Sequence, residues 1–140
     1  MIDEFNNEHQ FIMDALVEGI CGIDADGSIT FCNDALSRMT GHSKAEIVGK
    51  SVHDLLHHSR EDGSRYPREE CDLNKAIREG TPRQVAEGRL WKKNGSYLPV
   101  EYCGRPLPAN GSRTCYLATM KDLSEIEMAK EALRRSEEQY

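Results

Sequence analysis

Long apolar runs are absent from this chain, and so are the short motifs of the common catalytic centres. No stretch approaches the about 18 consecutive apolar residues of a membrane-spanning helix. Acidic residues near the start (Asp3, Glu4 and Glu8) stand where a signal peptide carries basic ones. Glycine-rich phosphate loops, the Gly-x-Ser-x-Gly nucleophile motif and the His-Glu-x-x-His zinc motif are also missing. We therefore expect a non-catalytic cytoplasmic domain without direct membrane contact, which leaves open a membrane anchor elsewhere in the parent protein.

Paired cysteines and basic clusters are missing as well. The five cysteines form no Cys-x-x-Cys pair, and four of them lie in strand-like segments. This favours small buried side chains in a reducing compartment over a disulfide framework, and it excludes covalent c-type haem attachment. The net charge is -6, and no Lys/Arg run is interleaved with aromatic residues. We therefore expect no nucleic-acid partner.

Hydrophobic periodicity predicts a single α+β domain. Its elements follow in the order helix, two strands, several short helices, three strands, helix. The predicted helices cover about 5–17, 35–40, 43–48, 52–57, 69–79 and 124–140, and the strands 20–24, 28–32, 84–92, 97–105 and 113–121. Because consecutive strands joined by tight turns pair antiparallel, we expect a five-stranded antiparallel sheet with short helices on one face. The predicted division is an N-terminal flanking helix at 1–18, a core at 19–122 and a C-terminal helix at 123–140.

The end of the chain changes from strand to helix periodicity around Asp122. Ser124 and Glu127 have the spacing of a capping box, so we expect the helix to begin at about Ser124. An imperfect, exposed heptad seam then follows at alternating spacings of three and four, interrupted by two charged residues; its members are Leu123, Ile126, Lys130, Leu133, Glu137 and Tyr140. The seam predicts a homodimer, and a chain that ends inside a helix is typical of a module taken from a longer protein. The expected transmission residues are Asp122, Leu123, Ile126 and Leu133. Two alternatives stay open: a surface helix packed on its own domain, and an Asp122 that only supplements the helix cap.

A series of short motifs recurs in a distinctive order: Asp24-Ala25-Asp26-Gly27, Asn33-Asp34-Ala35, Met39-Thr40-Gly41, Ile47-Val48-Gly49-Lys50, Lys93-Asn94-Gly95-Ser96 and Asp122-Leu123-Ser124. With these motifs, the chain resembles PAS domains over residues 15–124. The resemblance implies the PAS fold and a sensory input module of a bacterial sensor histidine kinase or cyclic-dinucleotide enzyme. Residues 124–140 resemble the helix that joins such a module to an output domain of the same polypeptide.

Two polar residues in these motifs have a structural interpretation. Asp24 stands at a strand end before the Asp26-Gly27 turn, where its carboxylate can accept backbone hydrogen bonds. Asn33 can do the same where the second strand becomes a helix.

The inward positions of the predicted strands and helices are the candidates for a ligand pocket. They form a mostly apolar wall with two phenols, which suits a small aromatic or fatty ligand or simply a filled core. The candidate residues are Cys21, Ile23, Leu56, Ile77, Val100, Tyr102, Tyr116, Ala118 and Met120.

The resemblance also allows cofactors to be tested against the chain. The flavin-binding branch carries its reactive cysteine in a Gly-x-Asn-Cys-Arg-Phe motif, which is absent, and Met120 aligns with that branch's polar amide. Haem-binding members supply a histidine from the long helix before the third strand, where residues 71–77 contain none. We therefore expect no cofactor.

A histidine-rich segment remains as a weak candidate for a metal or haem site. Its candidate ligands are His53, His57, His58 and Cys71, with Asp62 on a loop. His53 and His57 would share a helix face, but a second fixed pair is missing, so we expect local hydrogen bonds there and no metal.

These observations predict a sensory module that binds a small ligand or partner and relays a conformational signal through its C-terminal helix. Two alternatives stay open. One is a ligand-free scaffold for dimerisation and transmission, and the other is a metal- or haem-dependent redox sensor.

Overall fold

The computed structural model describes residues 2–60, 62–108 and 111–138. Its elements follow the predicted order. They are α1 (Ile2–Ala15), β1 (Gly19–Ile23), β2 (Ile29–Cys32), α2 (Asp34–Thr40), α3 (Lys44–Ile47), α4 (Val52–Leu56), the 3-10 helix η1 (Arg68–Glu70), α5 (Asp72–Glu79), β3 (Arg83–Trp91), β4 (Tyr97–Pro106), β5 (Tyr116–Asp122) and α6 (Ser124–Glu138).

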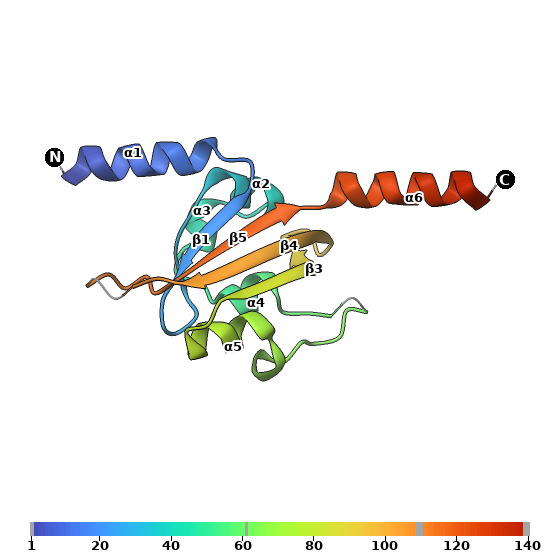
Figure 1. Cartoon of the computed structure of the whole chain (residues 1–140). Helices are drawn as coiled ribbons and strands as arrows, with labels where there is room; N and C mark the ends of the chain where they lie inside the picture. The colour runs from blue at the N-terminus through green and yellow to red at the C-terminus, as the bar shows by residue number, and fades with distance from the viewer. Residues whose placement is uncertain (1, 61, 109–110, 139–140) are drawn as a thin grey trace.

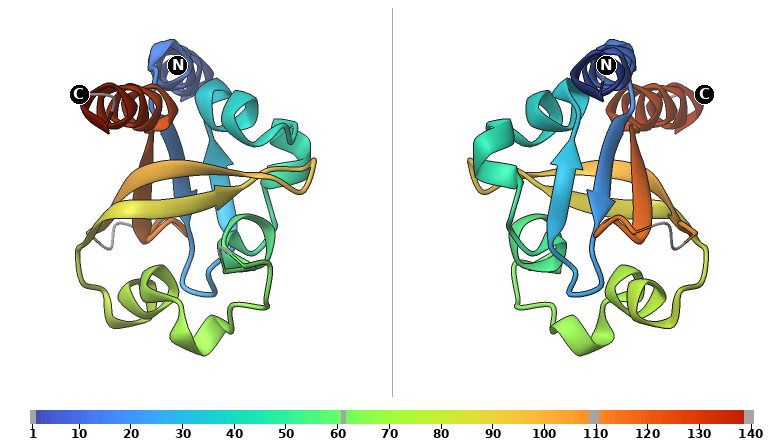
Figure 2. Two further views of the ribbon diagram at one scale, coloured as in Figure 1. Left: turned by 90° about the vertical axis from the view of Figure 1, so that its right-hand side faces the viewer. Right: turned by 90° about the vertical axis from the view of Figure 1, so that its left-hand side faces the viewer.

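The five strands form one antiparallel sheet in the order β2-β1-β5-β4-β3. The last strand therefore lies at the centre, between β1 and β4, and it leads directly into α6 (Figure 1). The segment that carries α2 to α5 connects the edge strand β2 to β3, the strand at the opposite edge of the curved sheet (Figure 2). The predicted five-stranded antiparallel sheet is confirmed.

The hydrophobic core lies between the sheet and the short helices. Helix residues such as Leu36 and Leu73 pack there against strand residues such as Leu90. All nine candidate pocket residues are also buried in this core, and the most exposed of them, Tyr102, has only 8% of its surface accessible. The predicted inward faces of the strands are therefore correct.

Both structural interpretations of the motif residues are confirmed. Asp24 Oδ1 accepts hydrogen bonds from the backbone N–H groups of Asp26 (2.9 Å) and Ser28 (3.0 Å), which close the turn at Gly27. Gly27 has a φ of 86°, a conformation that side chains rarely tolerate. Asn33 caps α2, and its Oδ1 accepts from the N–H of Leu36.

Two local predictions were wrong. The expected helix at 69–79 is split, because Cys71 is extended (ψ 118°) between η1 and α5 and its side chain is buried. The second is the capping box with Ser124 as the residue before the helix. Ser124 is instead the first helical residue, and its backbone N–H donates to Oδ1 of Asp122, which precedes the helix, at 2.8 Å.

The two flanking helices leave the core in opposite directions (Figure 1). Seen end-on, they lie at the same edge of the molecule (Figure 2). Within the described ranges, no helix has both the length and the apolar character needed to cross a membrane.

Candidate functional site

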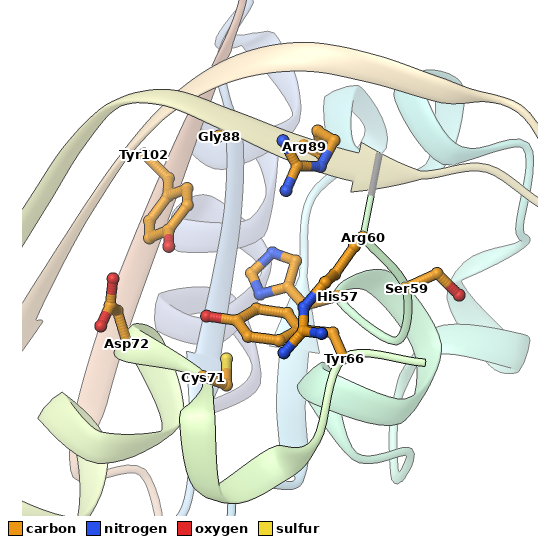
Figure 3. Close-up of a pocket in the computed structure, with 9 residues that line it drawn as sticks. All are labelled: His57, Ser59, Arg60, Tyr66, Cys71, Asp72, Gly88, Arg89 and Tyr102. Carbon is orange, nitrogen blue, oxygen red and sulfur yellow. The ribbon is translucent and has the colours of Figure 1, made fainter. Parts of the chain in front are cut away.

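A cavity of about 320 Å³ opens between the β3–β4 edge of the sheet and the segment from α4 to α5. Figure 3 shows the side chains that surround it, which come from both sides of this gap. The lining residues are His57, Ser59, Arg60, Tyr66, Cys71, Asp72, Gly88, Arg89 and Tyr102. The wall is therefore richer in polar and charged groups than the apolar pocket expected from the sequence.

His57 lies at the C-terminal end of α4, where its backbone N–H donates to the carbonyl of His53. Its side chain is 5% exposed and its ring stacks on Tyr102, with 5.4 Å between the centroids. Burial, together with the smaller effects of the neighbouring His53 and His58, lowers the pKa of His57 to about 4. The imidazole is thus neutral near pH 7. Its buried Nε2 atom has no hydrogen-bond partner among the described residues.

Arg89 differs from the other charged residues of the cavity wall in its lack of an ion-pair partner among the described residues. Its buried Nε atom has no hydrogen-bond partner, and Arg89 forms no ion pair within the described ranges. The other two charged lining residues are paired: Arg60 with Glu70, and Asp72 with Arg83 at 2.9 Å. An unpaired, partly buried guanidinium therefore faces the cavity.

Tyr102 forms the wall on the sheet side, and its position depends on Gly88. A Cβ atom on Gly88 would lie 2.6 Å from the Tyr102 ring, so a larger residue would displace the ring. The pairing register of β3 with β4 shifts just before Gly88. Burial raises the pKa of Tyr102, so the phenol stays protonated and can donate a hydrogen bond.

Of the nine candidate pocket residues, only Tyr102 lines this cavity. The other eight fill the core, and their role in ligand binding stays a prediction. Sequence reasoning considered His57 as a metal or haem ligand and missed Arg89. The pattern of β3 carries no signal for Arg89, because its importance depends on the distant α4.

Two of the four candidate metal ligands, His53 and His58, have local polar contacts. His53 Nε2 lies 2.7 Å from the carbonyl oxygen of Tyr66, and His58 Nδ1 lies 2.6 Å from Ser59 Oγ. These contacts confirm the predicted local hydrogen bonds for His53 and His58, but not for His57, whose Nε2 atom has no partner among the described residues. Cys71 is buried, which raises the pKa of its thiol. No three potential ligands converge in the part of the chain that the structure describes.

Comparison with known protein families decides the identity of the fold. The family described as PAS domain matches residues 17–125. The chain belongs to the PAS domain family. The match covers every strand of the sheet and begins and ends at the flanking helices. A search of curated proteins finds no significant match.

Solved structures confirm the PAS fold. The PAS domain of an HTR-like protein from Haloarcula marismortui has a TM-score of 0.68 and 20% identity, with 86% of this chain and 93% of that chain covered. A domain of a sensory box sensor histidine kinase/response regulator from Geobacter sulfurreducens has a TM-score of 0.65 and 20% identity, with 87% and 97% covered. An RNA-binding Light-Oxygen-Voltage receptor has a TM-score of 0.70 and 18% identity, with 99% and 38% covered.

The joint between the PAS core and α6 is short and fixed to the sheet. The backbone N–H of Leu123 donates to the carbonyl of Pro99 on β4 at 2.9 Å, and its side chain is only 8% exposed. The expectation that Leu123 belongs to an exposed seam was therefore wrong, because this residue packs on the domain. Ile126 and Leu133 are 42% and 60% exposed, as the seam requires. The transmission roles of these residues and of Asp122 stay predictions.

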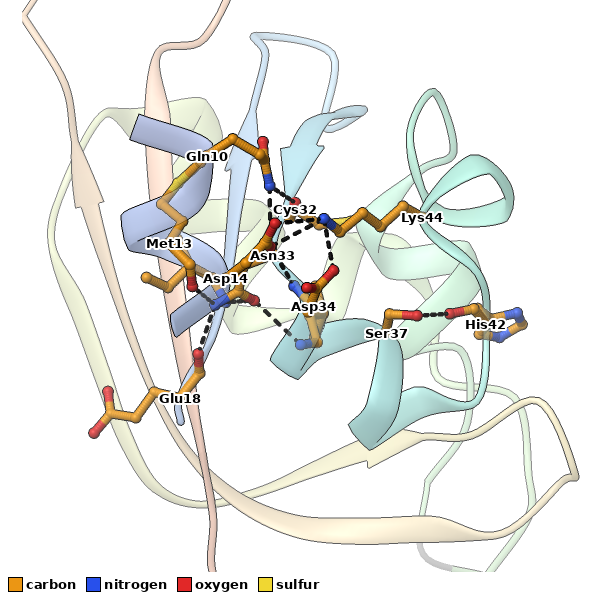
Figure 4. Close-up of polar contacts among 12 residues, drawn as sticks. Gln10, Met13, Asp14, Glu18, Cys32, Asn33, Asp34, Ser37, His42 and Lys44 are labelled. Atoms are coloured by element: carbon orange, nitrogen blue, oxygen red, sulfur yellow. Dashed lines mark hydrogen bonds and ion pairs between the residues drawn. The ribbon is translucent and has the colours of Figure 1, made fainter. Parts of the chain in front are cut away.

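A polar cluster fastens α1 to the PAS core (Figure 4). Lys44 Nζ lies 2.9 Å from Asp14 on α1 and 2.7 Å from Asp34 on α2. Asn33 Nδ2 donates to the carbonyls of Met13 and Glu18, both at 2.9 Å. The end of α1 is therefore held at the start of α2, beside the edge of the sheet.

Proposed function

We propose that this PAS domain is the sensory input module of a larger signalling protein. A small molecule or partner engages the cavity beside His57, and the change passes through α6 to an output domain of the same polypeptide. The observation that carries the proposal is the position of Tyr102. Tyr102 lines the cavity from β4. On the neighbouring strand β5 it is paired with Met120, which lies shortly before the joint between β5 and α6.

The route from cavity to helix is short. Val100, two residues from Tyr102 on β4, pairs with Asp122 at the end of β5. Leu123 then holds the start of α6 to Pro99. A shift of β4 against β5 would therefore change the direction in which α6 leaves the sheet. Spatial continuity supports this relay, and a measured coupling is what tests it.

We further propose that the module works as a homodimer. Ile126 and Leu133 expose apolar surface on one side of α6, and Phe11 and Ile12 do so on α1. The described α6 spans fifteen residues, and a helix of that length has marginal stability alone in water. Packing of these surfaces against a second copy would stabilise the helix and give the relay a partner to act on.

The ligand-free scaffold remains the second candidate. Eight of the nine predicted pocket residues belong to the buried core and do not line the cavity beside His57. In this reading, the cavity is only a recess and the domain serves dimerisation and passive transmission.

We propose that the module itself is non-catalytic, cytoplasmic and free of bound cofactor. All five cysteines are free thiols, which suits a reducing compartment. The cavity volume corresponds to about ten water molecules at roughly 30 Å³ each, which favours a compact ligand over a flavin nucleotide. A histidine kinase or a cyclic-dinucleotide enzyme is the proposed class of parent protein.

Sedimentation of the whole chain tests the part of the proposal that concerns α6. Leu133→Asp should weaken self-association by placing a charge in the seam. Met128→Asp is the matched control, because Met128 is also exposed but lies about 140° around the helix from Leu133. Equal association of the wild type and both variants would remove the dimeric relay.

A further inference from the structure

We propose that the cavity binds a small carboxylate with a planar apolar body, held by Arg89 and His57 against the ring of Tyr102. This inference rests on the proposed function, because it names the ligand class of the same input site. Figure 3 shows the Arg89 guanidinium and the His57 ring on facing sides of the cavity.

The charge of the cavity favours an anion. Arg60 and Asp72 are each paired with a residue outside the lining, so their charges are largely compensated. Arg89 alone among the charged lining residues lacks an ion-pair partner within the described part of the chain. A guanidinium presents several N–H donors in one plane and matches a carboxylate in a two-bond geometry.

Two buried nitrogen atoms at the cavity lack partners, and both would be satisfied by the same ligand. They are Nε of Arg89 and Nε2 of His57. Buried polar groups without partners are uncommon in folded proteins, because each has lost its hydration without gaining a bond. His57 is neutral near pH 7, so in the Nε2–H tautomer it can donate to a carboxylate oxygen without carrying a charge.

The size and remaining wall define the body of the ligand. About 320 Å³ accommodates roughly ten non-hydrogen atoms if each takes a volume near that of a water molecule. The rings of Tyr66, Tyr102 and His57 and the thiol of Cys71 supply the less polar part of the wall. Aromatic side chains of this kind pack well against a flat ring in offset or edge-on arrangements.

Phenylacetate and its neutral isostere phenylacetamide are suitable probes, because they share shape and size and differ in charge. Calorimetric titration of the whole chain measures binding directly. Trp91 fluorescence provides a second signal, because Trp91 Nε1 donates to the carbonyl of Ser59 at 2.7 Å and Ser59 lines the cavity. We expect phenylacetate to bind at least about tenfold more tightly than phenylacetamide.

Substitution of Arg89 separates a binding role from a structural one. Arg89→Met should weaken phenylacetate binding at least about tenfold while leaving the unfolding temperature equal or higher, because it removes an unpaired buried nitrogen. Arg89→Lys keeps the charge and should retain part of the affinity. Arg105→Met is the matched control, because Arg105 is exposed on β4 and lies outside the cavity lining.

Each contrary outcome has a distinct meaning. Equal affinity for the two probes, or equal affinity of wild type and Arg89→Met, would overturn the carboxylate class and leave a neutral ligand for the proposed sensor. Unfolding of both Arg89→Met and Arg89→Lys would make Arg89 a structural residue and overturn the proposal. No binding of either probe at about 10 mM would overturn both the carboxylate class and the ligand-sensing function, in favour of the ligand-free scaffold.

Discussion

Replacing Asn33 should destabilise this domain far more than a typical polar substitution. The side chain is fully buried and joins four backbone groups from three parts of the chain. Its Oδ1 accepts from the N–H groups of Ile20 and Leu36, and its Nδ2 donates to the carbonyls of Met13 and Glu18. One side chain thus connects the end of α1, the start of β1 and the first turn of α2.

The magnitude follows from these four bonds. In Asn33→Ala, the N–H groups of Ile20 and Leu36 lose their acceptor at about 1 kcal/mol each, and the carbonyls of Met13 on α1 and of Glu18 after α1 lose their donor. Including the small cavity, we expect a loss of about 3 kcal/mol in the free energy of unfolding, or roughly 10 °C in unfolding temperature.

Urea denaturation followed by circular dichroism measures this loss. Asn94→Ala is the matched control, because the Asn94 side chain accepts two bonds from Ser96 at an exposed turn and should cost less than about 1 kcal/mol. A cost for Asn33→Ala as small as that of the control would refute the reasoning.

Three further substitutions test the core and the cavity. Val100→Asp should cost about 4 kcal/mol or prevent folding, because it buries a carboxylate in the sheet; near-neutral urea stability would show that β4 faces the other way. Gly104→Ala should cost about 2 kcal/mol in thermal unfolding, because its Cβ would lie 2.5 Å from the Tyr116 ring; an unchanged unfolding temperature would contradict this contact. Below about pH 6.5 the unfolded state protonates His57 while the folded state, with a pKa of about 4, does not, so stability should fall by up to about 3 kcal/mol as pH drops between these values. His57→Phe should lose this part of the pH slope, and an identical slope in wild type and variant would show that His57 is not the responsible group.

The parts of this fold that sequence predicts well are those specified by local chemistry. Asp24 and Asn33 were interpreted correctly because an Asx side chain at a turn or helix start has few alternatives to capping nearby backbone groups. The strand faces were also predicted correctly, because alternation with a period of two distinguishes inward from outward residues.

The features that sequence missed depend on contacts between distant segments. The burial of Leu123 follows from its bond to Pro99 on another strand, whereas the helical pattern alone placed it in an exposed seam. The cavity arises where β3 passes α4, which brings Arg89 near His57. Neither residue belongs to a motif, so only the three-dimensional arrangement reveals that each has an unpaired buried nitrogen.

Deuterium uptake of α6 tests the relay most directly. The chain is exchanged with and without phenylacetate at a concentration that saturates the Trp91 signal, and uptake is followed in peptides that cover residues 122–133. The account predicts that bound ligand changes uptake at the β5–α6 joint and in α6 of the wild type, and that Arg89→Met shows no such change. Saturated binding with unchanged uptake across 122–133 would contradict transmission from the cavity to the helix.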